Sequence, residues 1–152
     1  SVWPMKAAME QSDAVMGSFQ LLLTCVAGVS LLVGGIGIMN MMLTSVTERT
    51  REIGLRRALG ATRGDVVAQF LLEAVLVCLL GGAAGMAAGY AAAWGFAGMA
   101  SQMAGSGAIT PQVPAAVAGG TVAVSAAVGV VFGLYPAWRA ARLSPVEALR
   151  HG

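Results

Sequence analysis

"TERTREIGLRRALGA", residues 47–61, is the most densely charged run of the chain, and long uncharged segments lie on both sides of it. No Asp, Glu, Lys or Arg occurs from Ala14 to Thr47, or from Ala74 to Trp138. The chain is 57% hydrophobic and only 11% charged, with a mean hydropathy of +0.77, which is not typical of a soluble domain. The charged run is therefore expected to separate segments that cross a membrane.

The uncharged segments have room for three membrane spans. A helix needs about 20 apolar residues to cross the hydrocarbon, so the first segment holds one span. The second is too long for one span and breaks at "SQMAGSGAITPQVP", residues 101–114, where polar residues, Gly and two prolines cluster. Backbone groups in lipid must bond internally, which excludes open strands. We therefore predict an all-α integral membrane fold, with transmembrane helices at about residues 19–43, 70–99 and 113–135.

The arginines predict the orientation of these spans. Five lie between the first and second spans and three follow the third: Arg49, Arg51, Arg56, Arg57, Arg63, Arg139, Arg142 and Arg150. Because Lys and Arg favour the cytoplasmic side, we expect a cytoplasmic C-terminus and an extracytoplasmic N-terminus. Lys6 opposes this only weakly, since it is single and accompanied by Glu10 and Asp13. The net charge of +2 reflects this sidedness and does not indicate a nucleic-acid partner.

Residues 1–18 are predicted to form a helix that leads into the first span. Their apolar residues recur at steps of four and three, as in the seam of a coiled coil, and an amphipathic helix on the membrane surface fits the pattern equally well. The seam consists of Met5, Met9, Ser12, Met16, Phe19, Leu23 and Val26. The opening lacks the basic start and short apolar core of a signal peptide, and it does not begin with Met. We expect the chain to be part of a longer polypeptide.

Small residues at intervals of four form a row on each of the second and third spans. Such rows let helix backbones approach closely, because association in lipid comes from packing; these spans are expected to pack on each other or on a second copy. The alternative is that Gly and Ala are simply common in membrane helices. The rows are Gly81, Gly85, Gly89, Ala93 and Ala97, and Thr121, Ser125, Gly129 and Gly133.

The segment "GGIGIMN", residues 34–40, does not indicate a nucleotide-binding loop. Asn40 stands where the third glycine is needed, and no strand precedes the segment. We instead expect Asn40 to form a hydrogen bond between helices near the end of the first span, worth about 1 kcal/mol.

The charged run itself is patterned as a short amphipathic helix, at about residues 48–59. Burying its arginines in lipid would cost about 2.5 to 3.5 kcal/mol each, so the run must lie in water or against protein. Glu48 precedes Arg51, and Glu52 precedes Arg56, at the spacing that favours ion pairs on a helix.

Turn signals follow this helix and recur at the C-terminus. Gly60 is a helix end, and Thr62 with Asp65 is a capping signal for the next helix. In "RLSPVEALRHG", residues 142–152, Ser144, Pro145 and Glu147 are the N-cap, first-turn proline and capping-box acid of a short helix at about 145–150. Each of the two short helices is either a docking surface for a partner or a helix lying on the lipid surface.

Two segments of the chain closely resemble a known family. They are "GGIGIMNMMLTSVTERTREIGLRRALGATRGDVVAQFLLEAVLVCLLGG", residues 34–82, and "GVVFGLYPAWRAARLSPVEALR", residues 129–150. They resemble the C-terminal membrane domain of the macrolide-exporter type of ABC permease, in the FtsX-like family that includes the cell-division permease and the lipoprotein-releasing permeases. The resemblance implies a dimeric four-span permease with a large outer domain between its first two spans. Residues 1–18 would end the extracytoplasmic stalk helix, and residues 19–152 would be the permease domain with the last three spans.

The resemblance also implies how such a permease works. The helix between the second and third spans of the four docks on an ATPase beside the C-terminal segment, and ATP-driven closure of the spans moves the stalk and the outer domain. The residues that match the docking motif are Glu48, Arg49, Arg51, Glu52, Gly54, Arg56, Gly60 and Ala61. Those that match the terminal motif are Pro136, Arg139, Ala140, Ala141, Pro145, Ala148 and Leu149; of these Arg139 and Pro145, with Glu147, are expected to dock.

The sequence indicates no catalytic or metal site of its own. A phosphate-binding loop needs a lysine, and the only lysine, Lys6, is preceded by "SVWPM". The single histidine is His151, and Cys25 and Cys78 have no second ligand at metal spacing, so both are expected to be small apolar core residues. ATP and magnesium are therefore expected on a partner ATPase, either fused or separate.

The resemblance implies further partners and a location. These are a second permease copy, the lipid bilayer, and a periplasmic adaptor with an outer-membrane channel, all at the bacterial inner membrane. Two alternatives to export stay open on the sequence: a regulatory scaffold that passes ATP-driven motion to cell-wall hydrolases, and lipoprotein release. The sequence does not favour the hypothesis that the chain is an enzyme in its own right.

Overall fold

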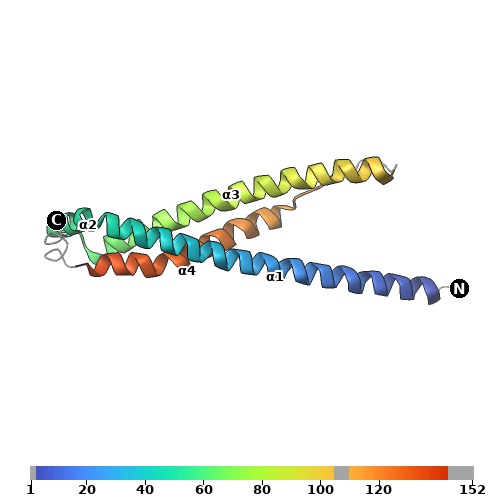
Figure 1. Cartoon of the computed structure of the whole chain (residues 1–152), viewed down its shortest axis with the longest axis horizontal. Coiled ribbons are helices and arrows are strands. Elements are labelled where there is room, and N and C mark those ends of the chain that lie inside the picture. The colour runs from blue at the N-terminus through green and yellow to red at the C-terminus, as the bar shows by residue number, and fades with distance from the viewer. Residues whose placement is uncertain (1–2, 105–109, 144–152) are drawn as a thin grey trace. The chain divides into compact units, whose positions relative to one another are not determined.

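The computed structural model describes residues 3–104 and 110–143. These residues form four helices and no strand: α1 (Trp3–Glu48), α2 (Thr50–Ala58), α3 (Arg63–Ala104) and α4 (Ala115–Arg142) (Figure 1). α1, α3 and α4 are long and apolar enough to cross a membrane. The prediction of an all-α fold with three spanning helices is confirmed.

The helices extend beyond the predicted spans at most ends. α1 and α3 contain the first two spans entirely. α4 begins at Ala115, so the first two residues of the third predicted span precede it. The second of these, Pro114, has the extended backbone of a helix N-cap, with φ −60° and ψ 144°. The predicted C-terminal helix at 145–150 lies outside the described residues.

The chain divides into two compact units, Ser1–Gly37 and Ile38–Gly152, and α1 runs across the division. In the first unit, residues 3–37 form a helix whose side chains are exposed almost throughout. The hydroxyls of Ser12, Ser18 and Thr24 each donate to the carbonyl oxygen four residues earlier, at 2.8 to 2.9 Å. Thr24 is the one of the three that lies in the predicted first span, where lipid offers a hydroxyl no partner, so its bond lets the helix carry it at membrane depth.

The second unit contains the packed part of the protein, and α3 and α4 lie side by side in it (Figure 1). The predicted row on α4 faces α3. A Cβ atom on Gly129 would lie 2.7 Å from the Cα of Val75, and one on Gly133 would lie 2.5 Å from the Cβ of Ala74. Real Cβ atoms do not approach backbone this closely, so the two helices meet only because these positions have no side chain.

The predicted row on α3 does not carry this contact. A Cβ atom added at Gly81, Gly85 or Gly89 would meet no atom within 4 Å. The neighbouring row faces α4 instead: it contains Ala74 and Gly82, the latter against Ser125. The two rows lie one residue apart on α3, and only the position of α4 shows which of them is packed. Packing of the outer row on a second copy remains a prediction.

α1 passes into α2 through a bend at Arg49. The hydroxyl of Thr50 donates to the carbonyls of Val46 and Thr47, at 3.0 and 2.8 Å, and the hydroxyl of Thr47 donates to that of Thr44 at 2.7 Å. Back-bonding of this kind bends helices, because the hydroxyl competes for the carbonyls of the ladder. The predicted helix at 48–59 is thus present as Thr50–Ala58. The side chain of Asn40, upstream of the bend, is exposed, and the predicted interhelical bond to it is not found in the described part of the chain.

The turn between α2 and α3 has the predicted geometry. Gly60 has a φ of 108°, and the amides of Gly60 and Ala61 donate to the carbonyls of Arg57 and Arg56, at 3.2 and 3.1 Å. These two backbone hydrogen bonds are the pattern found where a helix ends at a glycine. The capping signal is also confirmed: the Asp65 amide donates to the Thr62 hydroxyl at 3.2 Å, and the Thr62 amide donates to the Asp65 carboxylate at 2.8 Å.

The capping bonds also fix the charge state of Asp65. Hydrogen bonds from the hydroxyl and then the amide of Thr62 lower the pKa of this carboxyl group, which lies in the first turn of α3 ahead of the predicted span. The carboxylate is therefore ionised at neutral pH, and its negative charge suits the N-terminal end of the helix dipole.

Candidate functional site

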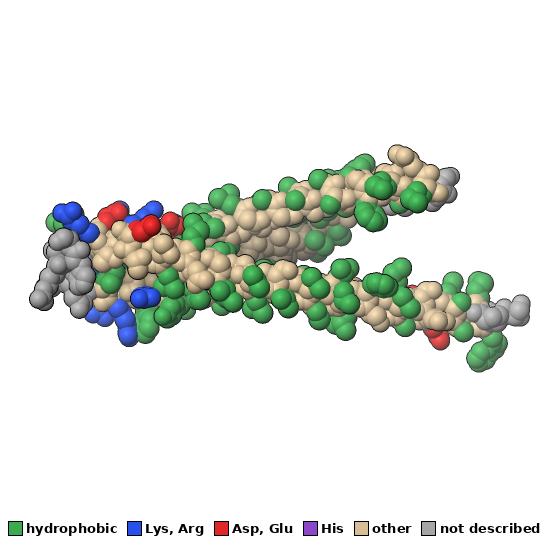
Figure 2. Space-filling model, in the orientation of Figure 1, with side chains coloured by type: hydrophobic (Ala, Val, Ile, Leu, Met, Phe, Trp, Pro, Cys, Tyr) green, Lys and Arg blue, Asp and Glu red, His purple; other side chains and the backbone are tan. Residues whose placement is uncertain are grey.

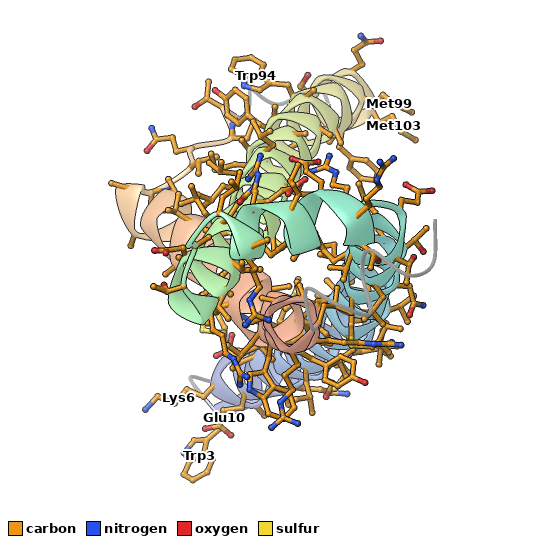
Figure 3. All side chains as sticks on the ribbon, turned by 90° about the vertical axis from the view of Figure 1, so that its left-hand side faces the viewer. Trp3, Lys6, Glu10, Trp94, Met99 and Met103 are labelled. Carbon is orange, nitrogen blue, oxygen red and sulfur yellow. The ribbon has the colours of Figure 1, made fainter. Side chains whose placement is uncertain are left out.

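Charged side chains gather around α2, whereas the spanning helices are covered mainly by hydrophobic ones (Figure 2). α2 lies across the ends of α3 and α4, as the view from that end shows (Figure 3). At the opposite end of α3, Trp94, Met99 and Met103 project outward with 48, 66 and 87% of their surface exposed (Figure 3). Apolar side chains in such positions suit a lipid environment, whereas the charged side chains in the described part of the second unit lie toward the α2 end.

α2 has two faces with opposite surroundings. At about 100° per residue, positions three and four apart share a side of the helix. The inner face, whose members are buried or half-buried, consists of Thr50, Ile53, Gly54 and Arg57. The outer face, whose members are exposed, consists of Arg51, Glu52, Leu55 and Leu59.

The inner face packs into the core of the second unit. Ile53 is only 4% exposed and joins a cluster contributed by all four helices. The cluster consists of Met42, Val46, Ile53, Val66, Phe70, Ala74, Ala137, Ala140 and Ala141. Pro136 of α4 is fully buried in the same part of the chain. The core therefore connects α2 to the ends of all three long helices through apolar contacts.

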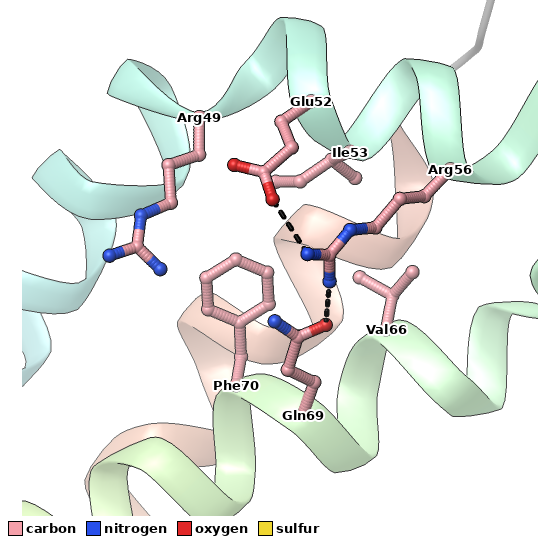
Figure 4. A pocket seen from close by; sticks show the side chains of 7 residues that line it. All are labelled: Arg49, Glu52, Ile53, Arg56, Val66, Gln69 and Phe70. Carbon is pink, nitrogen blue, oxygen red and sulfur yellow. Dashed lines mark hydrogen bonds and ion pairs between the residues drawn. The ribbon is translucent and has the colours of Figure 1, made fainter.

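A small polar seam also joins α2 to α3 (Figure 4). Arg56 donates from its two terminal nitrogens to Gln69 Oε1 and Glu52 Oε1, both at 2.7 Å. The space inside the seam is about 10 Å³, which is room for about one water molecule and not for a ligand. Arg56 and Glu52 are about half-exposed, so their ion pair is worth no more than about 1 kcal/mol. This predicted pair is confirmed, whereas Glu48 and Arg51 form no ion pair among the described residues.

A second ion pair ties the bend to α3. Arg49 Nη1 lies 3.7 Å from Glu73 Oε2, and both side chains are more than a third exposed. Glu73 is the last charged residue before the long uncharged segment. The pair therefore marks where the polar end of α3 gives way to its apolar part.

The tie between α2 and α4 is made by one side chain. Arg57 Nη1 donates to the carbonyl oxygen of Ala141 at 3.2 Å and to that of Leu143. Residues at the C-terminal end of a helix have carbonyls without intrahelical partners, and the helix dipole places negative charge there. A guanidinium donates hydrogen bonds to such carbonyls and places a positive charge beside the negative end of the dipole. Arg57 Nε is buried and has no hydrogen-bond partner among the described residues, so the group is enclosed on its inner side.

The outer face leaves apolar surface uncovered. Leu55 is 53% exposed and Leu59 is 81% exposed, on a helix that is otherwise highly charged. Arg51 is exposed beside them. Exposed apolar side chains rimmed by polar ones mark sites of interaction with a protein or a membrane.

The residues matched to the docking motif are distributed over both faces and the turns. The exposed ones are Glu48, Arg49, Arg51, Glu52, Arg56, Gly60 and Arg139, whereas Ala61 is half-buried. Gly54 is buried against the core and is not accessible to a partner from outside. Pro145 and Glu147, with Ala148 and Leu149, lie outside the described residues. Their docking roles remain predictions.

Three residues at this end were not among the expected site residues. Leu55 and Leu59 share a helix side in the sequence, but periodicity does not tell whether that side is buried or exposed. Arg57 contacts a carbonyl 84 residues away, which no local pattern reports. The sequence does place Arg57 on the same helix face as Ile53, and this was the one signal that Arg57 contacts the core side.

The remaining polar side chains of the described residues were expected to form no metal site. In residues 3–104 and 110–143, no three His, Cys, Asp or Glu side chains are grouped as a metal site would need. Cys78 is buried in α3, as expected of an apolar core residue, but Cys25 is exposed on α1, so that expectation was wrong for it. The guanidinium of Arg142 stacks on Trp138 of the same helix, 3.5 Å from the ring centre.

Comparison with known proteins decides the family. A model described as "FtsX-like permease C-terminal" matches residues 24–145, which is most of the chain. The chain belongs to this family. The FtsX-like domain is 48% identical over 148 residues to the uncharacterized ABC transporter permease YknZ of Bacillus subtilis, covering 94% of this chain and 35% of that protein. It is 52% identical over 132 residues to the macrolide export ATP-binding/permease protein MacB of Chromobacterium violaceum, covering 87% and 20%.

A third relative agrees with these two. MacB of Shewanella oneidensis is 51% identical over 141 residues, covering 93% of this chain and 20% of that protein. The chain thus spans about a fifth to a third of the length of these relatives. Membership of the family and three apolar helices together make it the multi-pass membrane domain of an ABC transporter permease.

Proposed function

We propose that this domain couples ATP hydrolysis by a partner ATPase to mechanical work across the membrane, with the outer face of α2 as the surface on which the ATPase docks. ATP and magnesium belong to that partner, which is either fused to the permease or a separate subunit. The relatives named ATP-binding/permease proteins support the pairing of such a domain with an ATPase.

The direction in which the outer leucines point carries the proposal. The inner face of α2 is turned toward α3 and α4, which run into the membrane from that end. The outer face is therefore turned away from the bilayer. Leu55 and Leu59 cannot be covered by lipid in this arrangement, which argues against a helix lying on the membrane surface. A protein partner with an apolar recess and acidic residues for Arg51 would cover them.

The orientation follows from the same surface. An ATPase that uses cellular ATP works in the cytoplasm, so α2 and the C-terminus are proposed to be cytoplasmic and the N-terminus extracytoplasmic. The arginine bias of the sequence supports this assignment. The site of action is then the bacterial inner membrane, and α1 leads toward the outer side.

Export is the output that the comparisons support. Two of the relatives described above are named macrolide export proteins. We propose that the complete machine of this chain includes a second permease copy, a periplasmic adaptor and an outer-membrane channel. In this scheme ATP binding draws the ATPase domains together, α2 moves with them, and the spanning helices carry the motion outward.

Charge and apolarity on the outer face can be reversed without touching the core. In the complete transporter in lipid nanodiscs, Arg51→Glu with Leu59→Asp should abolish cross-links between the permease and the ATPase domain and uncouple ATP hydrolysis from motion of the spans. Mapping the cross-linked peptides works whether the ATPase is fused or separate. Arg63→Gln, at an exposed arginine outside both faces, is the matched control. Unchanged cross-links in the double variant would contradict the proposal.

A further inference from the structure

We infer that Arg57 is the positioning residue that makes α4 follow α2. The inference rests on the proposed docking of an ATPase at α2, and it concerns how the motion leaves that helix. α2 reaches α1 through the chain at Arg49, and it reaches α3 through a four-residue turn. No covalent connection of this kind links α2 to α4.

α2 and α4 are connected by two kinds of contact, apolar packing and hydrogen bonds. Ala137, Ala140 and Ala141 pack in the shared core, but alanine side chains are small and offer a smooth surface that permits sliding. The hydrogen bonds from Arg57 Nη1 to the carbonyls of Ala141 and Leu143 are directional, and they hold the last turn of α4 at one point of α2. The hydrogen bonds of the Arg57 guanidinium are therefore the contact that fixes the position of α4 relative to α2.

The chemistry of the tie suits a permanent connection. One terminal guanidinium nitrogen carries two hydrogens and serves two acceptors at once. The acceptors are carbonyls at a helix C-terminus, where a cation is favoured. If the group turned outward, the carbonyls of Ala141 and Leu143 would lose the donor that satisfies them at the helix end. The Arg56 seam lacks the enclosure of the Arg57 group, because it is about half-exposed.

The consequence is a division of roles between adjacent arginines. Arg56 points to α3 and Arg57 to α4, so α2 holds both helices of the packed pair from one turn. When the ATPase pushes α2, α3 moves through the turn and the core, and α4 is carried by its packing on α3 and, at its last turn, by Arg57. Loss of Arg57 should leave the ATPase attached while α4 no longer keeps its position relative to α2.

Spin labels on α2 and α4 test this directly in the complete transporter with its ATPase. In a background with Cys25→Ala and Cys78→Ala, labels at Ala58→Cys and Leu134→Cys report one distance, since both positions are exposed and belong to neither α2 face nor the seam. Without Arg57 substitution, this distance should be the same in the nucleotide-free and ATP-bound states. With Arg57→Gln, it should broaden and change on ATP binding, while cross-links to the ATPase remain.

Two further variants serve as controls for charge and for position. Arg57→Lys retains the charge and should restore a narrow distance at least in part, whereas Arg63→Gln should match the parent. Amides in the last turn of α4 should exchange with deuterium about tenfold faster in Arg57→Gln, because their helix end has lost its tie. An unchanged distance and unchanged exchange in Arg57→Gln would overturn the inference. Loss of ATPase cross-links in that variant would overturn it as well, because the residue would then act in docking.

Failure of the proposed function has a different signature. If the ATPase does not dock on α2, the outer-face variant Arg51→Glu with Leu59→Asp retains its cross-links whatever Arg57→Gln does. If only the present inference fails, the outer-face variant loses them and α4 still follows α2 without Arg57.

Discussion

The inner and outer faces of α2 differ in what surrounds them, although they are made of similar residue types. Each face carries one arginine with large aliphatic side chains near it, yet Ile53 is 4% exposed and Leu59 is 81% exposed. The inner arginine binds backbone carbonyls of α4, whereas Arg51 of the outer face forms no ion pair in the described chain. The comparison teaches that hydrophobicity by itself does not separate a packing face from a docking face. The separation comes from the helices that meet one side of α2 and not the other.

The same substitution on the two faces should give the largest contrast. Ile53→Asp places an unpaired charge in the core and should lower the free energy of unfolding by about 3 to 5 kcal/mol. Leu59→Asp should change it by less than about 0.5 kcal/mol, because the position is exposed. Thermal unfolding of the transporter in lipid nanodiscs measures both. Equal losses of stability in the two variants would show that the outer face is also packed.

The glycine rows of α3 and α4 extend the comparison into the spans. Gly129→Ala forces a Cβ against the backbone of Val75 and should destabilise the pair by about 1 to 3 kcal/mol. Gly85→Ala meets open space within the chain and should be neutral or stabilising. The same unfolding assay applies, with Gly85→Ala as the matched control. A loss in Gly85→Ala alone would place the packed row on the other side of α3.

The capping bonds of α3 should have a smaller effect. Thr62→Ala removes the hydroxyl that accepts from the Asp65 amide and should cost about 1 kcal/mol. Thr24→Ala removes only a hydroxyl that bonds within its own helix, so it should have little effect. A shift in unfolding temperature for Thr62→Ala and none for Thr24→Ala is expected. A larger shift in unfolding temperature for Thr24→Ala than for Thr62→Ala would mean that the turn does not position α2.

The polar seam should have an effect on stability similar in size to that of the capping bonds. Arg56→Ala loses an exposed ion pair and a hydrogen bond to Gln69, together worth about 0.5 to 1.5 kcal/mol at most. Raising the salt concentration should reduce the difference between variant and parent, since screening weakens the pair in the parent. A loss as large as that of Ile53→Asp would show that the seam and not the core holds α2 in place.

Local signals in the sequence predicted the elements well. Uncharged length located the three spanning helices, and Gly60, Thr62 and Asp65 located the turn, because these signals act over a few residues. The sequence predicted the Gly81 row on α3, whereas Gly82 and Ala74 meet α4, and only the position of α4 distinguishes the two rows. Asn40 was expected to bond between helices, but its side chain is exposed and forms no interhelical hydrogen bond among the described residues. Arg57 could not be assigned because its acceptors lie at the far end of the sequence.

The central claim is that the outer face of α2 contacts the ATPase and the inner face does not. A photo-activated cross-linking amino acid placed at Leu59 of the complete transporter, and in parallel at Val66 of the core, tests it by mass spectrometry of the linked peptides. We predict links from position 59 to the ATPase domain, and links from position 66 only to α2 and its neighbours in the core. An absence of ATPase peptides at position 59, with the transporter folded and hydrolysing ATP, would contradict the account.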